Sequence, residues 1–189
     1  MPPPETSRRR LMLDRLLDVF LAEGFRQFTL AELAERLHCS KTTLYTLGLS
    51  KEQVTVNAIV HFFKDATVWI EATTKLTVDP ADRLVTYLQC VADALRPASP
   101  AFMADLAAHP ATRVVYERNT LAAAERVGEL IDEGIALGVF RRVHGAFVAD
   151  TVAATMRRIQ TGEVLAATGM QDAEAYDQLA ALVLNGIRR

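Results

Sequence analysis

Two short amphipathic segments, separated by a tight turn, constrain the fold of this chain more than any other feature. Residues 30–37 place Leu30, Leu33, Ala34 and Leu37 along one stripe, and a second segment follows at residues 41–47. A helix of about two turns is not stable in water unless its apolar face is covered. The two segments must therefore pack on each other and on a third element.

Local capping signals support both helices. Thr29 followed three residues later by Glu32 is the pattern of a capping box, and Ser50 with Gln53 repeats it. Ser40 can cap the segment at residues 41–47, and Gly48 suits the position after its end. We therefore expect helix, turn and helix over residues 29–47, with a third helix opening at Ser50.

The rest of the chain also has the periodicity of helices. Leu13, Leu16, Leu17 and Phe20 recur at helical spacing, and Gly24 ends that segment. Further helices are predicted at about residues 50–74, 80–95, 110–138, 144–161 and 172–187, with a short one that starts at Ser99-Pro100. No segment alternates like a strand, half of the residues are hydrophobic and only 7% are aromatic. The prediction is an all-α protein of about nine helices.

Composition sets limits on the domains and the compartment. The predicted division is a small domain at residues 1–52, with a disordered Pro-rich arm at 1–7, and a larger helical domain at 53–189. Residues 1–52 hold eight Lys/Arg and seven Asp/Glu, and the remaining residues hold 13 Lys/Arg and 16 Asp/Glu. No apolar run approaches the ~18–20 residues of a membrane span. Two cysteines without metal-like spacing favour a reducing cytoplasm.

The polar face of the segment at residues 41–47 suggests contact with nucleic acid. A short helix packed on two others, with its outer face polar, is the layout of a helix-turn-helix, whose second helix enters the major groove. Lys41 can donate to guanine or phosphate, and Thr42 and Thr43 offer hydroxyls and methyl groups. Tyr45 can reach a phosphate through its hydroxyl, and Ser40 lies at a helix start that favours anions.

These residues resemble the tetracycline-repressor (TetR) family over about residues 8–54. The resemblance rests on the run from Thr29 to Leu37, on Ser40, on Thr43-Leu44-Tyr45 and on Ser50-Lys51-Glu52. It implies a helical homodimer that binds a palindromic operator as a repressor and is released by a small molecule. By position, it implies phosphate contacts at Thr29, Tyr45 and Lys51 and base or phosphate contacts at Lys41, Thr42 and Thr43.

Three positions depart from the family pattern. His38 stands where the turn usually has glycine, Leu47 where a polar contact is common, and Gly48 where an aromatic residue is usual. These departures leave open a TetR-like scaffold that has lost DNA binding and acts through other partners. An enzyme is not expected, because the chain has no nucleophile–base pair, no paired carboxylates at meaningful spacing and no phosphate loop.

The larger domain is expected to hold the effector and the dimer interface. Large side chains on its first helices predict an apolar cavity that takes a mostly hydrophobic molecule; they are Phe62, Trp69, Tyr87, Phe102, Met103 and Tyr116. The helices at 144–161 and 172–187 are apolar on more than one side, which predicts a four-helix dimer interface. Val152 and Leu182 were the expected interface positions on them.

Charged residues outside the turn have less specific interpretations. Arg8, Arg9 and Arg10 form either a solvated run or an arm that follows DNA. His61 and Asp65 are four residues apart on one helix and could hold a metal ion, but the sequence offers no third ligand. A surface pair or a core histidine is the expectation there, with no metal and no cofactor.

Overall fold

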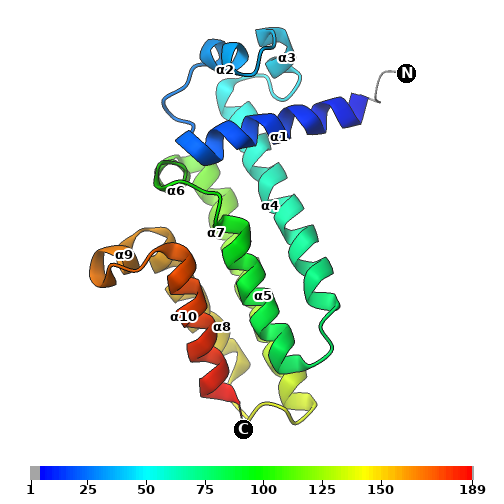
Figure 1. Ribbon diagram of the computed structural model, residues 1–189, viewed down its shortest axis with the longest axis vertical. Helices are drawn as coiled ribbons and strands as arrows, with labels where there is room; N and C mark the ends of the chain where they lie inside the picture. The colour runs from blue at the N-terminus through cyan, green and yellow to red at the C-terminus, as the bar shows by residue number, and fades with distance from the viewer. Residues whose placement is uncertain (1–4, 189) are drawn as a thin grey trace. The chain divides into compact units, whose positions relative to one another are not determined.

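The computed structural model describes residues 5–188 and is all-α, as predicted. Its helices over that range are α1 (Glu5–Glu23), α2 (Leu30–Arg36), α3 (Lys41–Tyr45), α4 (Lys51–Lys75), α5 (Pro80–Leu95), α6 (Pro100–Ala108), α7 (Pro110–Ala136), α8 (Gly145–Gln160), α9 (Glu163–Thr168) and α10 (Asp172–Ile187) (Figure 1). The β pairing within this range is an isolated bridge between Phe140 and Arg188.

The helices form two compact units. The first comprises residues up to 65 together with 97–116, and the second comprises 66–96 together with 117–189. Helices α4 and α7 each run from one unit into the other. Each unit is a group of residues whose backbones lie close together in space. The boundary predicted after residue 52 separates domains by function, and it stays a prediction.

The first unit is organised around the buried faces of α1 to α4 and α6. Its buried core includes Leu16, Phe20, Leu33, Leu44 and Phe102. These residues come from four different helices, so the short α2 and α3 are covered by partners rather than stable alone. Residues 1–4 of the predicted disordered arm lie outside the described range, and residues 5–7 belong to α1.

The second unit has its own core, in which α10 lies along α5 and beside α8 (Figure 1). A buried polar chain crosses this core: Thr120 Oγ1 donates to Gln160 Oε1 at 3.1 Å, and Gln160 Nε2 donates to the Tyr176 hydroxyl at 3.0 Å. Burial raises the pKa of the Tyr176 phenol, which therefore stays neutral. These bonds satisfy polar groups that would be costly to bury unpaired.

The helices differ from the sequence prediction in two respects. Helix α9 was not expected: it has six residues and no buried side chain, and its flanking Gly162 and Gly169 adopt positive φ angles. A short helix without an apolar stripe leaves no periodic signal. Helix α3 ends at Tyr45 rather than Leu47, so Gly48 is not the residue that terminates it.

Trp69, one of the six predicted effector residues, is 45% exposed. The buried face of α4 runs through Val54, Ala58, Ile59, Phe63 and Ile70, and Trp69 lies about 100° around the helix from Ile70.

Across the described residues, none of the helices combines the length and apolar character that crossing a membrane requires.

Candidate nucleic-acid interface

The first turn of α2 is held by the predicted capping box. The Thr29 hydroxyl accepts from the Glu32 backbone N–H at 3.3 Å, and the Glu32 carboxylate accepts from the Thr29 N–H at 2.7 Å. The hydrogen bond with the Thr29 backbone is the main reason why the pKa of Glu32 is lowered. Thr29 is exposed at this first turn.

The turn between α2 and α3 is a Schellman motif. The Cys39 N–H donates to the Ala34 carbonyl at 2.9 Å, and the His38 N–H donates to the Glu35 carbonyl at 3.0 Å. His38 adopts a φ of 49°, the left-handed conformation for which glycine is usual. The histidine therefore replaces glycine without changing the geometry of the turn.

Helix α3 separates a buried face from an exposed one. Leu44 and the following Leu47 are buried in the core of the first unit. On the other side, Lys41 and Thr42 are exposed and Tyr45 is 47% exposed. The Ser40 hydroxyl accepts from the Thr43 N–H at 3.1 Å and lies 2.9 Å from the Thr43 hydroxyl, so these two residues cap the helix.

Side chains from other helices hold the end of α3. The Leu47 carbonyl accepts from Asn57 Nδ2 at 2.6 Å and from Arg9 Nη2 at 3.2 Å. A Cβ at Gly48 would lie 2.7 Å from the backbone nitrogen of Val54, so only glycine fits beside α4 here. This close approach gives a structural reason for Gly48 that does not involve a positive φ.

Lys51 lies beside the loop that connects α1 and α2. Its Nζ donates to the Arg26 carbonyl at 2.9 Å, and partial burial lowers its pKa. The same loop is held by Asp105 of α6, whose Oδ2 accepts from the N–H groups of Phe25 and Arg26 at 2.7 and 2.9 Å. Lys51 thus has an internal partner in addition to any contact with a phosphate.

The seven residues predicted to contact DNA all lie in the first unit, from the start of α2 to the start of α4. Their contact with DNA stays a prediction. Sequence reasoning missed Thr46, which is exposed beside Tyr45, and the supporting residues Asn57 and Asp105. The exposed helical face could have revealed Thr46, whereas the partners of Asn57 and Asp105 are distant in sequence.

Solved structures similar to this chain include transcriptional regulators. A regulator from Saccharomonospora viridis in complex with choline has a TM-score of 0.78 at 18% identity. The match covers 97% of this chain and 98% of that regulator. A TetR-family regulator from Agrobacterium tumefaciens has a TM-score of 0.70 at 20% identity. The match covers 97% of this chain and 99% of the regulator. The chain has the TetR fold. The fatty acid degradation regulator FadR from Bacillus halodurans shares this fold, with a TM-score of 0.71 at 15% identity and full coverage of both chains. The sequence matches no family model and no curated protein.

Within this TetR fold, the six predicted effector residues fall in both units. In the first unit, the Phe62 and Phe102 ring centroids lie 6.0 Å apart, and Met103 and Tyr116 are buried in the same core. Tyr87 and Trp69 belong to the second unit, with Tyr87 buried and Trp69 largely exposed. Their role in binding an effector stays a prediction.

An open groove of about 510 Å³ lies elsewhere, between α7 and α8 of the second unit. Small and acidic residues line it, among them Ala124, Gly128, Glu129, Ala149 and Asp150. None of the six predicted effector residues is part of this lining. The groove therefore has a different chemistry from the apolar cavity that the sequence predicted.

The helices predicted to form the dimer interface each have a buried and an exposed apolar face. Val152, Met156 and Ile159 of α8 are buried within their own chain, whereas Phe147 is 71% exposed. On α10, Leu182 is 72% exposed. Val152 was expected at the interface, but the packing of the second unit already covers it, so an interface built on α8 would use Phe147 instead.

Proposed function

We propose that this chain is a DNA-binding transcriptional regulator that reads its operator with α3. The observation that carries the proposal is the exposed polar face of α3, with Lys41, Thr42 and Tyr45, on a helix whose other face is buried. A major groove about 12 Å wide admits such a helix. The TetR fold supports the same function, since regulators of transcription share it.

The contacts divide into two kinds. Lys41, at the start of α3, would contact base edges or nearby phosphates, as would Thr42 and Thr43 beside it. Thr29, Tyr45 and Lys51 would bond phosphates, and Ser40 lies among the free N–H groups of the helix start. Phosphate contacts position the protein, whereas base contacts discriminate between sequences.

The regulator would act as a homodimer. The exposed apolar side chains Phe147 on α8 and Leu182 on α10 support an interface that uses these helices. A two-fold axis would present two copies of α3 to half-sites separated by about one turn of DNA, roughly 34–36 Å or somewhat more. This geometry predicts a palindromic operator.

A small, mostly apolar effector would release a repressor of this kind. The aromatic cluster of the first unit, in which Phe62 lies beside Phe102 and Phe63 stacks on Tyr116 at 5.7 Å, supports an apolar site. Helix α4 is continuous from Lys51 to Lys75, so it offers a route from an effector to the DNA contacts. The effector can shift the equilibrium only by its difference in affinity for the two states, typically ~1–3 kcal/mol.

The test is selection of a binding sequence from random duplex DNA, followed by titration of variants on that sequence. Lys41→Ala should cost about 1–3 kcal/mol and alter the base preference. Lys51→Ala should weaken binding to all sequences and reduce the salt slope by about one. Lys64→Ala, which removes an exposed lysine of α4 outside the interface, is the control and should leave affinity unchanged.

Two outcomes would contradict the proposal. Binding that survives combined replacement of Lys41, Tyr45 and Lys51 would exclude α3 as the reading helix. A correctly folded wild-type chain that selects no DNA would favour the alternative, a TetR-like scaffold acting through other partners. Once an operator is known, candidate apolar compounds can be tested for release of the bound DNA.

A further inference from the structure

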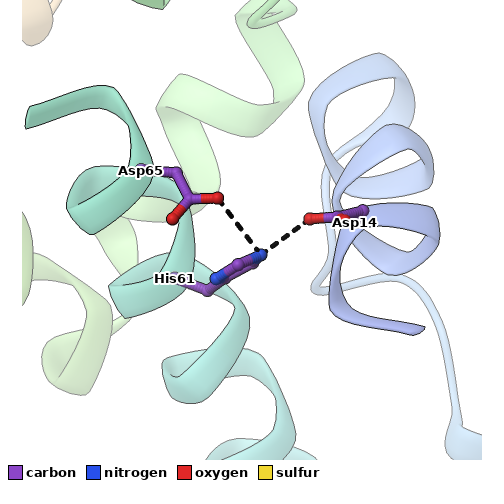
Figure 2. A group of neighbouring side chains, drawn as sticks. All are labelled: Asp14, His61 and Asp65. Atoms are coloured by element: carbon purple, nitrogen blue, oxygen red, sulfur yellow. Dashed lines mark hydrogen bonds and ion pairs between the residues drawn. The ribbon is translucent and has the colours of Figure 1, made fainter. Parts of the chain in front are cut away.

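Three metal-ligating side chains meet between α1 and α4, as Figure 2 shows. His61 Nε2 lies 2.7 Å from Asp14 Oδ1 and 3.7 Å from Asp65 Oδ2, and the three ligand atoms all lie within 4.8 Å of one another. Asp14 belongs to α1, whereas His61 and Asp65 are one turn apart on α4. Asp14 is the third ligand that the sequence did not reveal, because it is 47 residues from His61.

The spacing of these atoms is close to that of a metal site. Zn–N and Zn–O bonds of about 2.0–2.2 Å in a tetrahedral site place neighbouring ligand atoms roughly 3.3 Å apart. Asp14 would have to move back from His61 by a few tenths of an ångström. Its side chain is 49% exposed and can make this adjustment by rotation, while the His61 ring is only 13% exposed and stays in place.

An ion pair with Arg10 must open before Asp65 can bind a cation. Arg10 Nη2 lies 2.6 Å from Asp65 Oδ2. Arg10 is 65% exposed, so its guanidinium can turn into solvent and release Asp65. His61 Nε2 and Asp14 Oδ1, now 2.7 Å apart, could both bind a cation placed between them.

We propose that Asp14, His61 and Asp65 bind one divalent first-row transition cation, with Zn²⁺ as the probe, and that this ion fastens α1 to α4. One imidazole and two carboxylates suit such an ion better than Ca²⁺, which takes six to eight oxygen ligands. Water would complete the coordination, because the carboxylates lie at the surface. The proposal does not depend on DNA binding.

The experiment is calorimetric titration of the chelator-treated, untagged full chain with Zn²⁺. The expected result is one Zn²⁺ per chain and a higher melting temperature. Co²⁺ should bind at the same site and give a visible absorption spectrum. Mg²⁺ should leave the melting temperature unchanged.

Variants identify the site. His61→Ala and Asp14→Asn should each weaken Zn²⁺ binding by at least roughly 10–100-fold. Asp14→Asn keeps the size of an exposed side chain, so it tests the site even if His61→Ala fails to fold. Asp18→Asn on α1 and His144→Asn, which keeps a good cap for α8, are the controls and should bind Zn²⁺ like the wild type. Absence of Zn²⁺ binding, or binding that survives Asp14→Asn, would overturn the proposal and leave a hydrogen-bonded ion-pair cluster.

Discussion

At the scale of the residue, two glycines illustrate how the same substitution can have opposite effects. Gly134 lies in α7 against Phe140, and a Cβ there would come within 2.2 Å of the phenyl ring. Gly186 lies in α10, and a Cβ there would meet no atom within 4 Å. The first glycine is required by a close approach, whereas the second only costs helix stability.

We therefore expect Gly134→Ala to destabilise the protein by about 1–3 kcal/mol, because Phe140 is buried and cannot move freely. Gly186→Ala should stabilise it by up to about 0.5–1 kcal/mol, since alanine loses less entropy in a helix. Urea unfolding of both variants checks the pair. Equal effects of the two substitutions would mean that the contact between Gly134 and Phe140 is not formed in solution.

At the scale of the element, the loop between α1 and α2 depends on a carboxylate from α6. Asp105 Oδ2 accepts from two backbone N–H groups of the loop, and a Cβ at Gly24, which has a φ of 80°, would lie 2.6 Å from the same oxygen. The loop also supplies the Arg26 carbonyl to Lys51. Asp105 thus positions the start of α2 and one proposed DNA contact together.

Asp105→Ala should lower the free energy of unfolding by about 1.5–3 kcal/mol, because two N–H groups lose a charged acceptor. Asp93→Ala is the control. It removes an exposed carboxylate of α5 that pairs with Arg96 just after the helix, and it should cost less than about 1 kcal/mol. Thermal unfolding compares the two. If Asp105→Ala is as mild as Asp93→Ala, water replaces the carboxylate without loss.

At the scale of the whole molecule, the proposed dimer rests on apolar side chains that the chain itself leaves exposed. Phe147→Glu with Leu182→Glu should give a folded monomer, because both residues are more than 70% exposed in the single chain. Val152→Glu should instead unfold the second unit, at a cost above about 4 kcal/mol, because it would bury an unpaired charge.

Light scattering with circular dichroism separates these outcomes. Leu76→Glu is the matched control, since Leu76 is 82% exposed but lies outside α8 and α10, and this variant should remain a dimer. A wild-type chain that is a monomer at micromolar concentration would contradict the dimer. A dimer that persists in the Phe147→Glu, Leu182→Glu variant would place the interface on other residues.

The sequence by itself was sufficient to predict the helix-turn-helix and every described helix except α9. The signals are local: the Thr29–Glu32 capping box, the Ser40 cap and the Gly24 stop each act within about one helical turn, and the structure contains all three. Helix α9 was missed for the same reason, because it has neither a side-chain cap nor a buried face.

Only the tertiary structure decided which apolar faces are covered and which distant groups meet. Trp69 and Val152 both lie on helices with apolar residues on several sides, and their burial depends on the helices packed beside them, not on their own periodicity. Asp14 and His61 are far apart in sequence, as are Asp105 and Phe25. Such pairs form because the core brings their helices together, so no local pattern in the chain records them.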